Sequence, residues 1–203
     1  VSRTSIREAL RHLEAEHLIQ AEPRRGPVVA RITRKQIVEI YEVRALLEAA
    51  LVRRFAERAS DEQIAALRGI YEDLRITRTT GEVPRIVALT KRYIEHMMDA
   101  VDHELIGDML RKLTARINVV RVLAISVPGR LEESGHELAI VMDAIERRDG
   151  ELAARSLTTY VQNAAAASLK RFDEVERERD SVSKRGSRTT RAAPARSSGA
   201  GRK

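Results

Sequence analysis

The chain of 203 residues contains no cysteine and no tryptophan, and only 3% of its residues are aromatic. The absence of cysteine excludes a small secreted fold held by disulfides and fits the reducing cytoplasm, where we expect the protein to be located. No apolar run is long enough to span a bilayer, so we expect no membrane partner. So few aromatic residues disfavour a β-sandwich. The 43% of hydrophobic residues suffices for one or two soluble domains with an aliphatic core.

Acidic residues are missing from the C-terminal end of the chain. Residues 181–203 hold seven of the 37 basic residues and none of the acidic ones, so the net charge of +7 belongs to this end. The segment is rich in Ser, Arg, Ala and Gly, and burial cannot offset the entropy of ordering it. We therefore expect a basic disordered tail over 176–203. It either keeps the protein soluble or adds non-specific, salt-sensitive affinity for DNA.

A short amphipathic helix and a hairpin open the chain. Apolar side chains recur at helical spacing on one side of residues 3–15, whereas Arg3, Arg7 and Arg11 line the other side. The residues that follow predict two short strands around the turn at 23–26, where Pro and Gly supply turn dihedrals and two arginines lie at the tip. A helix followed by a hairpin with a basic tip is typical of the second half of a winged helix-turn-helix.

The segment from Thr33 to about Val175 has helical periodicity throughout. Two capping boxes, which begin at Thr33 and at Ser60, mark helix starts because a hydroxyl and an amide there satisfy free N–H groups. The predicted helices cover residues 34–59, 61–78, 83–101, 104–126, 130–148 and 150–175. The sequence therefore predicts an all-α bundle of six helices.

Two parts of the chain resemble a known family. The opening sequence, VSRTSIREALRHLEAEHLIQAEPRRGPVVARI, resembles the recognition helix and wing of the GntR family of bacterial transcription regulators. Residues 32–175 resemble the ligand-sensing helical domain, called FCD, of the FadR subfamily. That second resemblance rests on Tyr41-Glu42-Val43-Arg44, Glu48, Asp143-Ala144-Ile145 and Asp149. It implies three parts: half of a winged helix-turn-helix (1–31), an effector-binding and dimerisation domain (32–175) and the tail (176–203).

The resemblance also implies which residues contact DNA. In this family the recognition helix enters the major groove and the wing tip lies along the minor groove. The positions carried over are Ser2, Arg3, Thr4, Arg7, Arg24, Arg25 and Gly26. The chemistry of these residues agrees with DNA contact, because an exposed arginine can contact guanine through two hydrogen bonds and hydroxyls commonly bind phosphate. Taken alone, the arginine stripe would be an ordinary solvated helix face.

One departure from the family concerns the start of the chain. The sequence begins at the recognition helix, so the two helices that precede it in the family are absent from it. We expect a polypeptide that starts here to be a fragment and to bind DNA poorly, because the apolar side of the first helix has no partner.

A second departure concerns metal. Many related sensor domains bind a divalent ion through one Asp and three His on three helices. In this chain those positions are occupied by Thr90, Ile94, Leu138 and Tyr160, none of which is a ligand of that type. We therefore expect no metal and no other cofactor. His136 lies close in sequence to one of these positions but on the polar side of its helix.

Arg44 projects from the centre of an apolar helix face, with Glu48 one turn further on. A buried arginine is costly unless it is paired. One interpretation is an internal pair with Glu48 or another acid. The other is that Arg44 binds the carboxylate or phosphate of an effector, in a pocket completed by the four positions that replace the metal ligands. Such a pocket would suit a small anionic or amphipathic metabolite.

These features together predict a transcription regulator and no enzyme, since no catalytic constellation is present. The resemblance implies a homodimer on a palindromic double-stranded DNA operator, controlled by a small organic effector; repression is the commoner mode in such families. One alternative is an effector-binding or dimerisation module that no longer binds DNA specifically. Another is a sequence-blind DNA-binding protein that acts through its basic tail.

Overall fold

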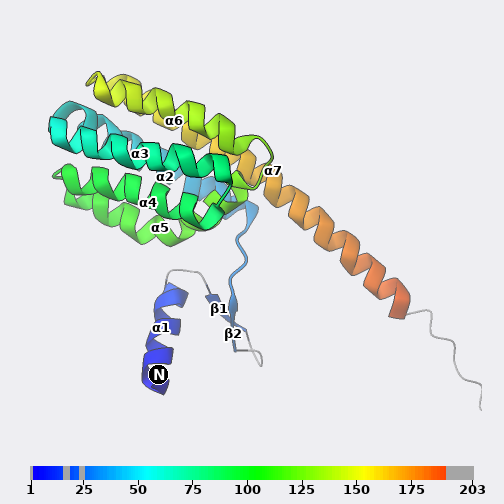
Figure 1. Ribbon diagram of the computed structural model, residues 1–203. Coiled ribbons are helices and arrows are strands. Elements are labelled where there is room, and N and C mark those ends of the chain that lie inside the picture. The colour runs from blue at the N-terminus through cyan, green and yellow to red at the C-terminus, as the bar shows by residue number, and fades with distance from the viewer. Residues whose placement is uncertain (1, 16–18, 23–25, 191–203) are drawn as a thin grey trace, which may run out of the picture.

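The computed structural model describes residues 2–15, 19–22 and 26–190. It contains a helix and a two-stranded hairpin followed by a bundle of six helices, as predicted (Figure 1). The elements are α1 (Arg3–Ala15), β1 (Ile19–Glu22), β2 (Gly26–Val29), α2 (Arg34–Arg58), α3 (Asp61–Thr80), α4 (Val83–Ala100), α5 (Glu104–Ile125), α6 (Arg130–Glu146) and α7 (Gly150–Thr190). In the described part of the chain, no helix has the length and apolar character needed to cross a membrane.

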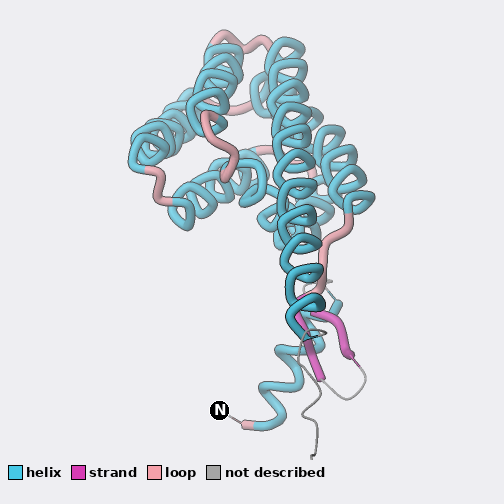
Figure 2. Tube along the Cα trace, turned by 90° about the vertical axis from the view of Figure 1, so that its right-hand side faces the viewer, coloured by secondary structure: helices cyan, strands magenta, loops and turns pink. Residues whose placement is uncertain are grey.

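Helix α1 and the hairpin lie together at one end of the molecule (Figures 1 and 2). The hydroxyl of Ser2 starts α1, since it accepts a hydrogen bond of 3.1 Å from the backbone N–H of Ser5. Strands β1 and β2 pair antiparallel, with Ile19 opposite Val29. Ile6 on α1 keeps half of its surface exposed. This small unit therefore buries little apolar surface of its own.

Both predicted capping boxes are present. The Thr33 side chain accepts a hydrogen bond from the backbone N–H of Gln36, and the Gln36 side chain accepts one from the backbone N–H of Thr33. Ser60 and Gln63 make the same reciprocal pair at the start of α3. These bonds satisfy N–H groups that have no acceptor within the helix, which is why α2 and α3 begin at these residues.

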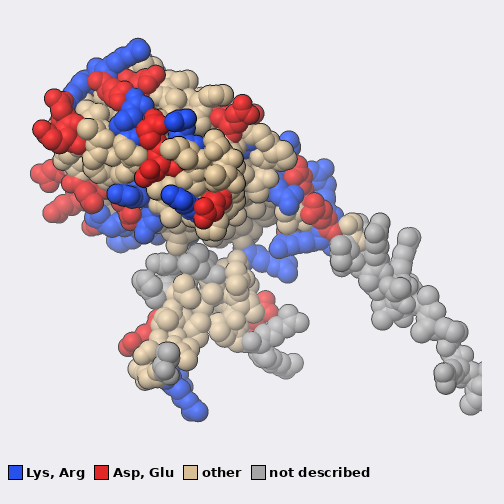
Figure 3. Space-filling view, viewed as in Figure 1, with Lys and Arg blue, Asp and Glu red and all other residues tan. Residues whose placement is uncertain are grey.

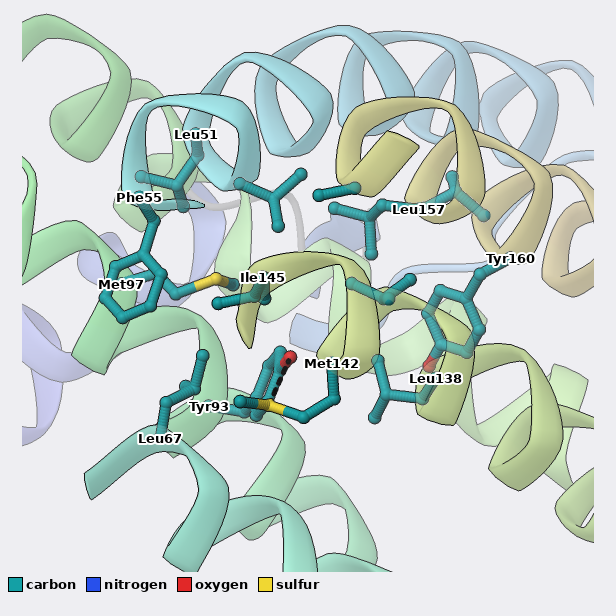
Figure 4. Packing of buried hydrophobic residues seen from close by; sticks show 14 of the residues in the cluster. Leu51, Phe55, Leu67, Tyr93, Met97, Leu138, Met142, Ile145, Leu157 and Tyr160 are labelled. Atoms are coloured by element: carbon teal, nitrogen blue, oxygen red, sulfur yellow. Dashed lines mark hydrogen bonds between the residues drawn. The ribbon is translucent and has the colours of Figure 1, made fainter. Parts of the chain in front are cut away.

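The core of the bundle is aliphatic, and α2 and α7 pack along each other within it. Figure 4 shows side chains from α2, α3, α4, α6 and α7 meeting in this core, where the Tyr93 hydroxyl points at the sulfur of Met142. A buried polar junction ties three helices together: the Ser168 hydroxyl of α7 donates to the carbonyl of Val120 on α5 at 2.6 Å and lies 2.8 Å from the Tyr41 hydroxyl of α2. The junction fixes the register of these helices because each buried hydroxyl needs its partner.

The end of the last helix was predicted wrongly. We expected it near residue 175, with a disordered tail over 176–203, but α7 continues to Thr190 and extends beyond the rest of the bundle (Figure 2). Charged pairs at helical spacing stabilise the first part of the extension, since Nη1 of Arg171 lies 3.2 Å from Oε2 of Glu174 and Nη1 of Arg179 lies 2.7 Å from Oε1 of Glu176. The prediction rested on the amino-acid composition of the segment and did not consider these pairs. The expectation for 191–203 lies outside the described residues.

Candidate DNA-binding and effector sites

The candidate DNA-contacting face of α1 is exposed. Arg3, Thr4 and Arg7 are all exposed, as is Ser2, whose side chain also caps the helix. Figure 3 shows acidic and basic side chains interspersed over the bundle; the unit formed by α1 and the hairpin also carries both, with basic atoms at the free end of α1. The face is therefore accessible to a ligand as large as a DNA duplex.

The hairpin is the second candidate DNA contact. Gly26 begins β2 with a φ of 79°, a left-handed conformation that glycine adopts without strain. No heavy atom lies within 4 Å of where a Cβ would stand, so Gly26 is required by backbone conformation and not by close packing. Arg24 and Arg25 lie outside the described residues.

The four positions that replace the metal ligands are inward-facing. Thr90, Leu138 and Tyr160 are buried, and Figure 4 places Leu138 and Tyr160 side by side in the core. The Thr90 hydroxyl donates to the carbonyl of Ile86 on its own helix, at 2.7 Å. Ile94 is half-buried beside a small cavity that Glu48 also lines.

These positions do not fit a divalent ion, because one hydroxyl, one phenol and two aliphatic side chains are not a transition-metal ligand set. Within the described residues no group of three or more His, Asp or Glu side chains is placed to hold an ion. His136 is exposed, as its position on the polar side of the helix predicted.

Arg44 forms the internal pair that we considered. Its Nε donates to Oε1 of Glu48 at 2.7 Å, and both side chains are only 1% exposed. The guanidinium also lies over the rings of Tyr41 and Tyr160, at 5.6 and 5.8 Å from their centroids. Burial disfavours the charged form, but the Glu48 carboxylate outweighs it and raises the pKa of Arg44. Arg44 is therefore a charged group held inside the bundle, next to Tyr160.

Two further arginines without an acidic partner enter the same interior, and sequence reasoning missed both; a third, Arg130, lies over the Tyr160 ring but is paired with Glu137. Arg121 on α5 is 5% exposed and Arg78 on α3 is 9% exposed, and neither forms an ion pair with a described residue. Nε of Arg121 and both Nε and Nη1 of Arg78 are buried without a hydrogen-bond acceptor. Each lies four residues after a buried apolar residue of its own helix, Arg121 after Ile117 and Arg78 after Leu74. Residues with this spacing share a helix face, so the pattern could have revealed both arginines.

Arg44, Arg78 and Arg121 give the interior an excess of positive charge around Tyr160. Burial by itself raises the pKa of the Tyr160 phenol, but the charges of Arg78, Arg44 and Arg121 outweigh it and lower that pKa. Burial and the charge of Arg44 lower the pKa of Arg121 to about 10. A site with two more guanidinium groups than it has acids to pair with them is chemically suited to an anion.

Comparison with known proteins agrees with this architecture. The FCD domain model matches residues 39–163, and the model for bacterial regulatory proteins of the gntR family matches residues 1–29. These matches correspond to the helical bundle and to the unit formed by α1 and the hairpin.

Individual relatives and a solved structure agree as well. The chain is 26% identical over 162 residues to the HTH-type transcriptional repressor RspR of Escherichia coli (strain K12), which covers 80% of this chain and 71% of that protein. It is 29% identical over 164 residues to the gluconate operon transcriptional repressor of Bacillus subtilis (strain 168), over 77% and 66% of the two chains. The structure of E. coli McbR/YncC matches 84% of this chain and 86% of its own, with a TM-score of 0.75 and 21% identity.

Proposed function

The chain belongs to the GntR family of bacterial transcription regulators and carries an FCD domain, and we propose that it is a repressor that a small organic anion releases from its operator. The family makes it a transcription regulator and not an enzyme. The observation that carries the effector part of the proposal is the excess of buried arginine around Tyr160.

The proposed contacts to DNA come from α1 and the hairpin. Arg3 and Arg7 would read base edges in the major groove, with Ser2 and Thr4 on phosphates. The hairpin tip, formed by Arg24, Arg25 and Gly26, would follow the minor groove. The exposed basic face of α1 supports this arrangement.

A homodimer is proposed because operators of this kind have two half-sites related by symmetry. Helices α2 and α5 pack against each other and leave apolar side chains in solvent. Leu46 on α2 is 74% exposed, and Leu105 and Met109 on α5 are 60% and 45% exposed. Burying these side chains against a second copy would remove them from water.

The proposed effector site consists of Arg44, Thr90, Ile94, Leu138 and Tyr160. Arg44 would supply positive charge beside the ligand, while the hydroxyl groups and aliphatic side chains would orient it and form the walls. Regulation requires that the effector bind one geometry of the dimer better than the other, so that it changes the spacing of the two α1 helices.

Fluorescence anisotropy with promoter DNA tests the DNA-binding part. The protein from the full reading frame that contains this sequence is titrated onto its own promoter duplex and onto a scrambled duplex, at two salt concentrations. We expect preference for the promoter, and a loss of about tenfold or more in the double variant Arg3→Ala/Arg7→Ala, because each guanine contact contributes about 1–3 kcal/mol. Arg85→Ala, which removes an exposed arginine of α4, is the matched control.

Two results would overturn the proposal in favour of the alternatives. Equal, steeply salt-dependent binding to both duplexes would assign DNA binding to the basic C-terminal segment. No binding to either duplex would favour a module for effector binding or dimerisation alone.

A further inference from the structure

A groove of about 610 Å³ lies between the C-terminal half of α3 and the N-terminal half of α6. We propose that this groove binds a small organic ligand with an oxyanion head group, either carboxylate or phosphate, and an apolar body. The inference deepens the proposed function and rests on it for the regulatory role of the ligand, but binding in the groove is testable without DNA. The groove's volume lies within the range of about 300–1,000 Å³ that is typical of small-molecule sites.

Arg78 is the anchor for the head group. Its side chain lines the groove although 91% of its surface is buried, and its Nε and Nη1 have no hydrogen-bond acceptor. A buried guanidinium with two unused donors is costly, because it has lost hydration without gaining a partner. Nε–H and Nη1–H leave different edges of the guanidinium, so each can donate one charge-assisted hydrogen bond to an oxyanion oxygen.

The start of α6 adds to this anchor. Gly129 precedes the helix in a left-handed conformation with a φ of 81°, and no side chain caps the free N–H groups of the first turn. An uncapped helix start carries partial positive charge and favours an anion. Gly129 and Leu131 both line the groove, so this end of α6 borders the same space as Arg78.

The other charges of the groove limit the ligand to a low net charge. Arg75 lines the groove but donates from Nε to Oε2 of Glu72 at 2.7 Å, and the carboxylate of Glu132 lies on the groove wall. Arg78 is thus the one groove cation of the described residues without a carboxylate partner, which suits a ligand with one anionic head group. His136 also lines the groove.

The rest of the groove is suited to an apolar body. Tyr71, Leu131 and Ala139 line it. Gly135 lies on the same wall, and apart from its own helix backbone no atom of the described residues is within 4 Å of the position its Cβ would take. The open space beside Gly135 is therefore room that a ligand occupies and that a larger side chain would fill.

Arg78 also joins the groove to the interior. Among the three arginines its charge lowers the pKa of Tyr160 the most, so an anion bound to Arg78 changes the electrostatic field at Tyr160.

Calorimetric titration of the full chain with hexanoate, hexyl phosphate and hexanol tests the site. These probes share the apolar body and differ in the head group. We expect at least one anion to bind more tightly than hexanol, and Arg78→Met to weaken that anion by about 10- to 100-fold while leaving hexanol unchanged. Tighter binding of hexanoate would indicate a carboxylate ligand, and tighter binding of hexyl phosphate would indicate a phosphate ligand.

A pair of glycine variants tests the groove without altering charge. Gly135→Leu should fill the groove and abolish binding of the anion. Gly69→Leu is the matched control, because Gly69 is also a helix-interior glycine with open space around it, and it does not line the groove. Thermal melts of both variants confirm that the fold is retained.

The outcomes separate this inference from the proposed function. Anions that bind no better than hexanol, or binding that survives both Arg78→Met and Gly135→Leu, would overturn the groove as the site. If binding follows the groove variants but does not release promoter DNA, the groove stands and the regulatory role fails. If promoter release responds to an anion independently of Arg78, the regulatory role stands and the groove assignment fails.

Discussion

The buried charges near Arg44 predict that removing Arg44 and removing Glu48 cost different amounts of stability, although the two residues form one pair. Arg44 and Glu48 are each 1% exposed and hydrogen-bonded at 2.7 Å, and Arg121 lines the same small cavity as Glu48. Removing one partner of a buried pair costs about 3–5 kcal/mol, because it leaves an uncompensated charge. With two cations around one carboxylate, the cost depends on which partner is removed.

Arg44→Met leaves Glu48 close to Arg121 and removes the repulsion between the two arginines, which is part of what lowers the pKa of Arg121. We expect a loss of about 3 kcal/mol in the free energy of unfolding, the lower end of the range. Glu48→Gln leaves two buried guanidinium groups without a carboxylate, so we expect about 5 kcal/mol. The double variant should lose less than the sum of the two.

Urea unfolding followed by circular dichroism at 222 nm measures these free energies, with Arg85→Met as an exposed control. The reasoning would be refuted if Arg44→Met cost more than Glu48→Gln, or if either single variant cost less than about 1 kcal/mol. An added anion that restores stability to Glu48→Gln, and not to the parent chain, would show directly that the interior accepts negative charge.

Further predictions concern single residues of the bundle. Ser168→Ala should destabilise by about 1–3 kcal/mol in urea unfolding, because Tyr41 loses a buried partner. Gly81→Ala should destabilise by about 1 kcal/mol, because residue 81 has a φ of 69°. In an alkaline absorbance titration, Tyr160, whose pKa is lowered, should ionise before Tyr41, whose pKa is raised by burial. Because the unfolded tyrosine has a pKa of 10.0, the free energy of unfolding should rise with pH as Tyr160 ionises below pH 10. Tyr160→Phe should remove this early ionisation step. If the proposed homodimer buries Leu46, Leu46→Glu should shift the protein from dimer to monomer in analytical ultracentrifugation.

Local signals in the sequence predicted most of the fold. The capping boxes at Thr33 and Ser60 located two helix starts, because the side chain and backbone groups that form them are three residues apart in the chain. The end of α7 could not be predicted from composition, since pairs such as Arg171 with Glu174 stabilise a helix through spacing and not through burial.

The candidate site was predicted only in part. Arg44 was evident because it interrupts an apolar face that can be traced along one helix. Its relation to Arg78 and Arg121 was not evident, since the three residues come from α2, α3 and α5 and meet only when the bundle is packed. The groove likewise depends on how α3 lies against α6, which no local pattern specifies.

The length of α7 separates the charge at its far end from the bundle. From Phe172, the last residue that packs on the core, to Thr190 the helix rises by about 27 Å at 1.5 Å per residue. The Debye length at physiological ionic strength is about 8 Å, so charges at the helix end are screened from the bundle by about three such lengths. An anion approaching the arginines of the bundle is therefore largely screened from Lys184, Arg185 and Arg188 on this part of α7.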